Sequence, residues 1–345
     1  MHGQRFGRLD QIALDWKRGA FPGARESDRK QRQSVFSHAE HALEHRRVLF
    51  IRVVLTMLIL GWVAVPEARA DDGGIDSRDY QVDLGRYFQH WFDRVDAAQA
   101  SQPSWMTPLV TVTARLTESV RYDQYWEHAG NGSRVDVYDA NHFLELIPTT
   151  TNEVLLNPPA YEVRSGNPAA AGWGDWPFLQ VKQRLLSANE HQGNYILTAL
   201  VEFQIASGNT AFTNRTAIIT PGIAGGKGWG KFNIQTYVAF PIPTSHTGTI
   251  GYSAELNVAL QYNLLTYFWP EFEVNTTRYF SGLRGGKTQV FLTPGLILGV
   301  FPIYNRIRAT IGAGYQFAVA PKLTRTPVLT PVYDHAWIVS AHMLF

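Results

Sequence analysis

Hydrophobic and polar residues alternate along much of the chain after residue 107. At the C-terminus, Trp337, Val339, Ala341, Met343 and Phe345 occupy every second position. Side chains alternate between the two faces of a β-strand, so one face of this segment is apolar. A strand that presents such a face to hydrocarbon belongs in a closed barrel, because an open sheet edge in lipid leaves backbone groups unpaired.

The alternation recurs in longer runs than the strands of soluble proteins, which have a mode of about 5–6 residues. Residues 250–264 carry eight apolar side chains at successive alternate positions. Bacterial single-chain barrels have an even number of strands, and the pattern predicts about 12. The predicted strands are 108–126, 140–148, 151–158, 175–188, 194–206, 215–225, 229–242, 248–266, 269–281, 287–301, 305–320 and 333–345.

The predicted connections alternate in length. The longer ones are 127–139, 159–174, 207–214, 243–247, 282–286 and 321–332, and the shorter ones are 149–150, 189–193, 226–228, 267–268 and 302–304. Long external loops and short periplasmic turns are typical of outer-membrane barrels. The sequence therefore predicts an all-β fold, a transmembrane antiparallel up-and-down β-barrel, with the longer connections outside.

Aromatic residues gather near the predicted strand ends. Indole and phenol rings favour the headgroup layer of a bilayer, so we expect two aromatic girdles. The residues concerned are Trp126, Trp176, Trp229, Tyr267, Phe268, Trp269, Phe301, Tyr304, Tyr333 and Trp337.

The N-terminal part differs in charge from the rest. Residues 1–70 carry 12 Lys+Arg and 7 Asp+Glu, whereas residues 71–345 carry 19 and 22. Residues 46–70 combine three arginines, an uncharged run and a small-residue cleavage site, which is typical of a secretory signal peptide cut after Ala70. Residues 1–45 are then a polar extension or a mis-assigned start. Residues 71–107 form a periplasmic segment with a short amphipathic helix, and 108–345 form the barrel.

The composition excludes several kinds of chemistry. The chain has no cysteine and contains no HExxH, calcium-loop or nucleotide motif, so we predict no metal, no cofactor and no catalytic residues. The mature part is slightly acidic, so no nucleic-acid partner is expected. A lipid-modifying enzyme is the alternative, since Ser340 and His342 share a strand face, but that face points inward.

The inward face is the candidate site of a pore. Rings of charge set ion preference in channels, whereas paired charges fill the interior of small barrels. Both readings stay open; in the filled one, Glu271 or Glu273 would meet Lys287, and Arg306 or Arg308 would meet Asp334. The predicted pore-lining residues are Arg115, Arg121, Asp123, Lys182, Arg184, Lys231, Gln235, Glu255, Asn257, Gln261, Glu271, Glu273, Asn275, Lys287, Arg306 and Arg308.

Several short motifs resemble a known family. They are the residues 105–113 (WMTPLVTVT), 174–176 (GDW), 194–199 (NYILTA), 226–235 (GKGWGKFNIQ), 269–275 (WPEFEVN), 286–295 (GKTQVFLTPG) and the closing Phe345. They resemble porin-like outer-membrane transporters related to the barrels of aromatic-degradation pathways. The resemblance covers most of the mature chain and implies passive or facilitated transport, without naming a substrate.

Pattern and resemblance together predict an outer-membrane porin or transporter that passes small solutes through a polar, mixed-charge lumen. The alternatives are a barrel-embedded lipid-modifying enzyme and a non-conducting structural or adhesive barrel. The expected partners are outer-membrane lipid, the barrel-assembly machinery and small solutes, with oligomerisation open. The predicted location is the outer membrane of a Gram-negative cell.

Overall fold

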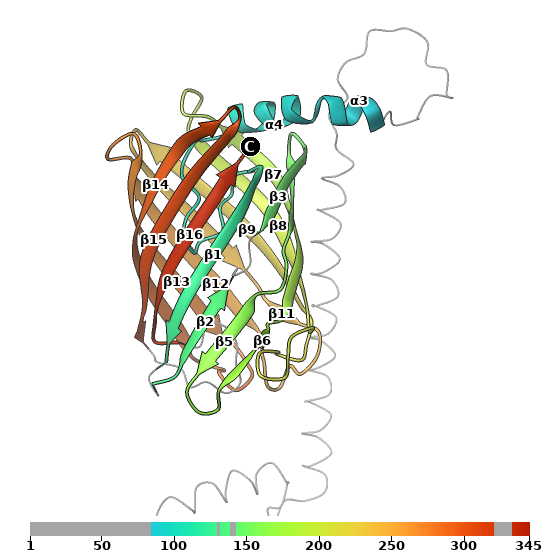
Figure 1. Ribbon diagram of the computed structural model, residues 1–345, viewed down its shortest axis with the longest axis vertical. Coiled ribbons are helices and arrows are strands. Elements are labelled where there is room, and N and C mark those ends of the chain that lie inside the picture. The colour runs from blue at the N-terminus through green and yellow to red at the C-terminus, as the bar shows by residue number, and fades with distance from the viewer. Residues whose placement is uncertain (1–83, 130–131, 139–142, 321–332) are drawn as a thin grey trace, which may run out of the picture. The chain divides into compact units, whose positions relative to one another are not determined.

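The computed structural model describes residues 84–129, 132–138, 143–320 and 333–345. Within these ranges the chain forms a closed 12-stranded antiparallel barrel. Figure 1 shows this barrel from the side. The predicted extension 1–45, the signal peptide 46–70 and the segment 71–83 lie outside the described residues. The fold class expected from the alternation is therefore confirmed.

Pairing of the first strand with the last closes the ring. Ser119 lies opposite Leu344 and His128 lies opposite His335, so the two strands pair over their whole length. In ring order the strands are β1 (Ser119–His128), β3 (Leu144–Thr149), β4 (Asn152–Leu156), β7 (Trp176–Ala188), β8 (Tyr195–Ile205), β9 (Ile218–Trp229), β10 (Phe232–Ala239), β12 (Ser253–Tyr262), β13 (Phe268–Tyr279), β14 (Thr288–Tyr304), β15 (Ile307–Ala320) and β16 (His335–Leu344).

Four short strands extend the wall beyond this ring. They are β2 (Arg134–Tyr138), β5 (Tyr161–Ser165), β6 (Ala170–Trp173) and β11 (Ile242–Pro243). β2 pairs with β1, β5 pairs with β2, and β6 pairs with β5. The predicted loops 127–139 and 159–174 are therefore wrong in part, because both contain strand. Pro158 and Pro159 separate β4 from β5, since proline cannot donate to the ladder.

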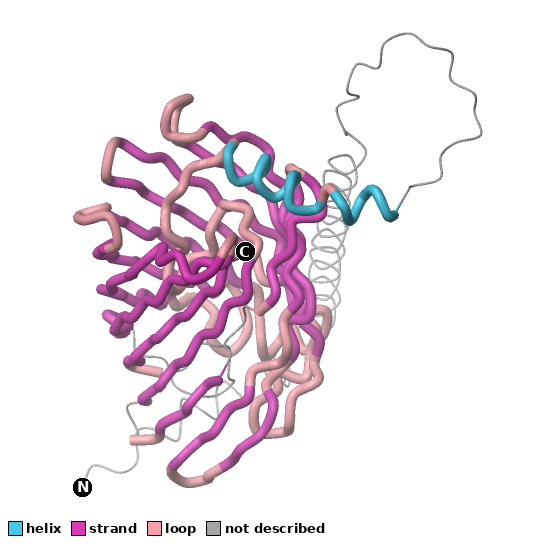
Figure 2. The backbone as a smooth tube through the Cα atoms, turned by 45° about the horizontal axis from the view of Figure 1, so that its top comes forward, coloured by secondary structure: helices cyan, strands magenta, loops and turns pink. Residues whose placement is uncertain are grey.

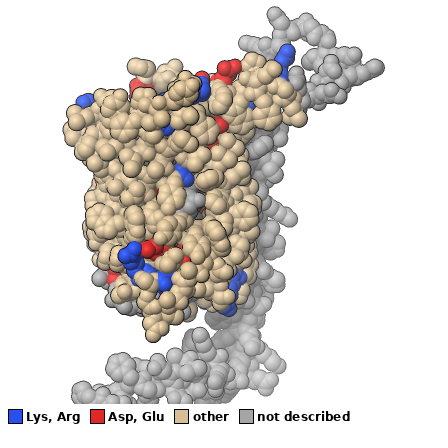
Figure 3. Space-filling model, viewed as in Figure 1, with Lys and Arg blue, Asp and Glu red and all other residues tan. Residues whose placement is uncertain are grey.

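The two faces of the wall differ as the alternation predicts. On β12, Leu256 and Tyr262 are exposed outward, while Ala259 and Gln261 are buried. On β16, Trp337 and Met343 are exposed, and Ile338 and Ser340 between them are buried. Figure 3 shows that acidic and basic side chains gather near the two ends of the visible face, with few between them. The outer surface therefore suits hydrocarbon.

The connections confirm the predicted asymmetry of the two ends. The turns at one end, called here the short-turn end, span 150–151, 189–194, 230–231, 263–267 and 305–306. The described connections at the other end, the long-loop end, span 166–169, 206–217, 240–252 and 280–287. Helices α3 (Leu84–Gln89) and α4 (Trp91–Ala100) and the C-terminus lie at the short-turn end (Figures 1 and 2).

The predicted amphipathic helix is two consecutive helices, α3 (Leu84–Gln89) and α4 (Trp91–Ala100). Val95 and Ala98 of α4 are buried against Leu116 and Ile147. Among the described residues, neither helix has the length and apolar character needed to cross a bilayer.

The predicted first strand is wrong for residues 108–118. The wall begins at Ser119, and residues 102–118 have no regular secondary structure. Two predicted girdle residues also differ, because Trp269 and Tyr333 are 7% and 6% exposed and lie inside the barrel. Trp176, Trp229, Tyr267, Tyr304 and Trp337 are exposed on the outer surface, as expected for a girdle.

Candidate functional site

Residues 102–118, called here the lumen segment, connect α4 to β1 through the barrel interior. The side-chain amide of Gln102 donates to the Leu116 carbonyl (2.7 Å) and accepts from the Leu116 amide (2.9 Å). The two ends of the segment are therefore held together near the short-turn end. Between them the chain reaches the inner faces of β8–β10 and β13–β15.

Two glutamates on β13 bind the backbone of the segment. The amide of Leu109 donates to Glu271 (3.1 Å), and those of Val110 and Thr111 donate to the two oxygens of Glu273 (2.8 and 2.6 Å). The Thr111 hydroxyl also donates to Glu273 (2.5 Å). Buried carboxylates need such donors, because an unsatisfied charge in the interior is costly. These bonds fix an irregular segment that has no ladder of its own.

Apolar side chains of the segment lie against glycines of the wall. A Cβ atom built on Gly295, Gly312 or Gly314 would lie 2.5–2.7 Å from a methyl group of Leu109. A Cβ atom on Gly226 would lie 2.6 Å from the Trp105 ring. Real Cβ atoms do not approach so closely, so the missing side chains make the room that Leu109 and Trp105 fill.

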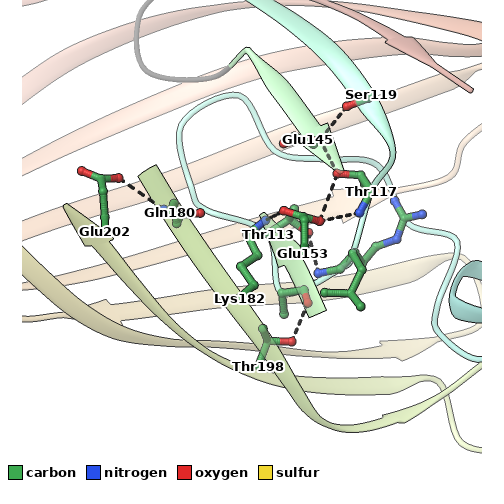
Figure 4. A network of polar contacts seen from close by, with 12 residues as sticks. Thr113, Thr117, Ser119, Glu145, Glu153, Gln180, Lys182, Thr198 and Glu202 are labelled. Carbon is green, nitrogen blue, oxygen red and sulfur yellow. Dashed lines mark hydrogen bonds and ion pairs between the residues drawn. The ribbon is translucent and has the colours of Figure 1, made fainter. Parts of the chain in front are cut away.

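A second network joins the end of the segment to the wall on β3, β4 and β7. Glu153 accepts from the Thr117 amide (2.5 Å) and pairs with Lys182 (2.7 Å). Glu145 accepts from the hydroxyls of Thr117 and Ser119. Figure 4 shows these side chains converging on the segment from neighbouring strands. The side chains of Lys182 and Glu153 are at most 1% exposed, so the pair is desolvated. Loss of either partner would leave the other charge buried and unpaired.

Uncharged polar side chains make further contacts between the wall and the lumen segment. Gln235 on β10 donates to the Met106 carbonyl (2.8 Å) and accepts from the Thr113 hydroxyl (2.9 Å). Thr198 on β8 donates to the Ala114 carbonyl (2.6 Å). The segment is therefore bonded to the inner faces of β3, β4, β8, β10 and β13, which lie around the ring.

Most predicted pore-lining residues lie on the inner face of the wall. Several are engaged: Arg121 pairs with Asp123 (2.8 Å), and Arg184 donates to the carbonyls of Ala98 and Thr150 (2.8 and 2.6 Å). The predicted residues on the inner face are Arg121, Asp123, Lys182, Arg184, Gln235, Glu255, Asn257, Gln261, Glu271, Glu273 and Asn275.

Five predicted pore-lining residues lie elsewhere. Arg115 belongs to the lumen segment and donates to the Trp105 carbonyl. Lys231 and Arg306 are exposed in turns of the short-turn end, and Arg308 lies at its rim. Lys287 is exposed in the loop 280–287. These four residues have the sequence spacing of inward-facing positions, but each lies at or beyond the end of its strand. They therefore do not line the lumen.

The expected charge pairs across the lumen are also wrong. Glu271 and Glu273 bind the lumen segment instead of Lys287. Arg306 pairs with Asp96 of α4 (2.6 Å) instead of Asp334. The residues that sequence reasoning missed are Trp105, Leu109, Thr111, Glu145 and Glu153. The available signal was the row of small or apolar residues on the inner face, such as Gly312 and Gly314, which leaves space that another part of the chain must fill.

Charged groups at the rim hold the helix and the start of the segment. The hydrogen bond from Arg306 lowers the pKa of Asp96, and the same bond raises the pKa of Arg306. Glu190 accepts from the amide and hydroxyl of Ser104, both at 2.6 Å. Burial raises the pKa of Glu190, but the bonds from Ser104 outweigh it and leave that pKa below the ordinary value. Both carboxylates therefore favour the charged, bonded state.

The residues considered for lipid chemistry lie inside the wall. Ser340 and His342 are hydrogen-bonded at 2.9 Å and are 1% and 8% exposed on the inner face of β16. A lipid acyl chain on the outer surface does not reach this pair. Within the described residues, no group of three or more His, Asp or Glu side chains could hold a metal ion.

No family model matches the chain, and no curated protein matches it significantly. Among solved structures it is similar to a KdgM porin in complex with disordered oligogalacturonate, at 8% identity and a TM-score of 0.38, covering 66% of this chain and 99% of that one. It is also similar to OmpT, an outer membrane protein of Vibrio cholerae, at 10% identity and a TM-score of 0.28, covering 66% and 95%. The likeness to aromatic-degradation barrels stays a prediction, and scores this low carry no argument about solutes.

Proposed function

We propose that this protein is an outer-membrane channel for small solutes and that the lumen segment gates it. The observation that carries the proposal is a closed barrel whose inner wall bears many polar side chains and is occupied by a segment without strand structure. The wall closes on itself through β1 and β16 and does not need the segment for its ladder. A segment held by side-chain bonds can leave a lumen that main-chain bonds keep intact.

The proposed location rests on the outer surface. A belt of exposed apolar residues, with aromatic residues towards the ends, suits a bilayer. The expected signal peptide at 46–70 would export the chain, and the barrel-assembly machinery would insert a strand that ends in Phe345. We include outer-membrane lipid as the partner of the wall, and leave oligomerisation as an expectation.

The proposed gate rests on the kind of contact that holds the segment. Its backbone forms no strand ladder. Its anchors are carboxylates, side-chain amides, the Thr198 hydroxyl, the Arg121 guanidinium and several apolar side chains, among them Trp105 and Leu109. Each hydrogen bond contributes only about 0.5–1.5 kcal/mol net, or about 1.5–3 kcal/mol to a charged group. Release of the segment breaks these side-chain contacts and leaves the main-chain ladder of the barrel intact.

A disulfide across the gate tests the proposal. The chain has no native cysteine, so Leu109→Cys with Gly295→Cys creates one possible bond. A Cβ atom on Gly295 would lie 2.5 Å from the Leu109 methyl group, so side chains at the two positions meet. A disulfide needs such close neighbours, because its two Cβ atoms lie ~3.5–4.5 Å apart. In planar bilayers we expect wild-type openings, a silent oxidised variant, and recovery of openings after reduction.

A permanently closed structural barrel is the competing function, and the many bonds to the segment favour it. That function predicts no solute-dependent conductance in the wild type or in the reduced variant. Conductance that is the same in the oxidised and reduced variant would contradict the gate, while leaving the channel. Correct folding is checked in each case by heat-modifiable migration in detergent gels.

A further inference from the structure

We infer that the inner wall around β13 is a binding site for peptide chains, and that the lumen segment occupies it in place of an incoming peptide. The inference rests on the proposed function and names the solute class. Its evidence is the bound segment itself, because the wall holds residues 106–114 through their backbone groups along a path that bends at residues 109–111.

The first argument is the choice of backbone groups. Three consecutive amides, those of Leu109, Val110 and Thr111, donate to Glu271 and Glu273. Successive N–H groups of an extended strand point to opposite sides, so these three amides reach neighbouring carboxylates because the backbone bends at residues 109–111. Consecutive N–H groups are a feature of peptides, whereas a sugar presents hydroxyl groups. Main-chain hydrogen bonds supply affinity without depending on sequence, as in other peptide-binding proteins.

The second argument is that the wall also forms hydrogen bonds with carbonyls and a hydroxyl of the same stretch. Gln235 donates to the Met106 carbonyl and accepts from the Thr113 hydroxyl, and Thr198 donates to the Ala114 carbonyl. Gln235, Glu273 and Thr198 are each at most 1% exposed. Residues 106–114 thus make carbonyl, amide and hydroxyl contacts, and their partners lie on β13, β10 and β8.

The third argument is the pocket for a side chain. Gly295, Gly312 and Gly314 leave a recess that Leu109 fills, next to the three bound amides. A recess beside a backbone-binding wall selects one side chain of a bound peptide. We therefore expect a preference for a medium-sized apolar residue, such as leucine, at the position of Leu109.

The charge of the site predicts which charge a bound peptide should carry. Among the described residues, Glu271 and Glu273 accept hydrogen bonds from backbone amides, the Thr111 hydroxyl and the side-chain amides of Gln261 and Asn275, and neither pairs with a lysine or arginine side chain. A peptide that brings a positive group near these carboxylates gains a charge-assisted bond that the segment does not make. Cationic peptides should therefore bind better than acidic peptides of the same length.

The test uses a chain in which the segment is loosened but the wall is intact. In the full-length Trp105→Gly/Leu109→Gly variant, the two apolar anchors that lie against wall glycines are removed, and Glu273 and Gln235 remain. A chain that lacks residues 102–118 is the second variant, for the case in which the first keeps its segment in place. Both are reconstituted in planar bilayers after heat-modifiable migration confirms folding.

The probe is the acetylated, amidated peptide Thr-Pro-Leu-Val-Thr-Val-Thr, the sequence of residues 107–113. Its control carries N-methyl groups at the positions of Leu109, Val110 and Thr111, so that it cannot donate to Glu271 or Glu273. We expect the probe to block conductance, and the control to need an about tenfold or higher concentration. This factor follows because a hydrogen bond to a charged group contributes about 1.5 kcal/mol or more.

Matched variants locate the site. Glu273→Gln in the loosened chain should raise the blocking concentration of the probe, whereas Glu255→Gln, on the inner face of β12, should leave it unchanged. Conductance that the probe does not block, or that the N-methylated control blocks equally well, overturns the peptide site while the channel stands. Folded variants that never conduct overturn the proposed function, and the peptide site with it.

Discussion

Residues 108–118 and β15 carry the same alternation of apolar and polar side chains, yet they lie in different places. β15 exposes Ile311 and Val319 on the outer surface and buries Gly312 and Gly314 inside. The lumen segment buries most of its residues, apolar and polar alike, within the barrel. Alternation therefore predicts an extended chain with two unlike faces, and the surroundings decide whether lipid or protein covers the apolar one.

The surroundings of the segment explain why it does not join the wall. Its apolar residues meet inward-facing apolar residues: Leu116 packs with Ile147, and Trp105 and Ala114 pack with Leu200 and Tyr237. Its backbone amides meet carboxylates. A barrel whose inner wall were polar throughout would offer no such place. The inner face of the wall, more than the segment's own pattern, sets where the segment lies.

The largest expected effect comes from placing a charge on the outer surface. Leu256→Arg on β12 should destabilise the barrel by about 2–4 kcal/mol near the middle of the bilayer, because the guanidinium meets hydrocarbon. Unfolding by urea in lipid vesicles measures the change. Asn257→Arg, one residue along on the inner face, is the matched control and should cost far less. Equal effects would mean that the two faces of β12 do not differ as described.

The next effect tests the fit of the segment against the wall. Gly314→Ala should cost about 1–3 kcal/mol, because the added Cβ atom meets Leu109. Leu109→Ala removes that methyl group, so the double variant should be more stable than the sum of the single changes predicts. A double-mutant cycle of urea unfolding measures the coupling. Strict additivity would place Leu109 away from Gly314.

Removing the carboxylate anchor should have a similar or smaller effect. Glu273→Ala leaves the amides of Val110 and Thr111 without their acceptor, at a cost of about 1–3 kcal/mol to the bound state of the segment. We expect faster trypsin cleavage after Arg115 in the folded barrel, measured by mass spectrometry. Glu255→Ala is the control on the inner wall, and equal acceleration in both variants would count against a specific anchor.

The smallest expected effect is a dependence on pH at the rim. The pKa of Glu190 is lower in the folded protein than its ordinary value of 4.5, so its contribution is complete above pH 4.5 and is lost as the pH falls through the folded pKa. The melting temperature of Glu190→Gln should therefore lie below that of the wild type at pH 7 and approach it in acid. A difference that grows in acid would reverse the assigned sign.

Much of the wall could be predicted from the sequence. The period of 2 fixed which residues of β12, β15 and β16 face outward, because burial on one side and lipid on the other demand strict alternation. The short turns followed from the lengths between the runs. Inner-face residues such as Gln235, Gln261 and Glu273 were likewise predicted by position alone.

The contents of the lumen could not be predicted in the same way. Contacts such as Val110 to Glu273 join residues far apart in the sequence, and no local pattern encodes them. The inward glycines of β14 and β15 were a signal of occupied space, but glycine also marks bends and bulges in strands. Strand ends were equally uncertain, and Lys231, Lys287 and Arg306 lie beyond them for that reason.

The most direct test of the lumen segment's position is disulfide formation in intact cells. The pair Leu109→Cys/Gly295→Cys is compared with Leu109→Cys/Leu296→Cys, in which the second cysteine is one residue along β14, on its opposite face. Mass spectrometry after mild oxidation should find nearly complete cross-linking between 109 and 295 and almost none between 109 and 296. Little cross-linking in the first pair, or equal amounts in both, would mean that the segment does not lie in the lumen.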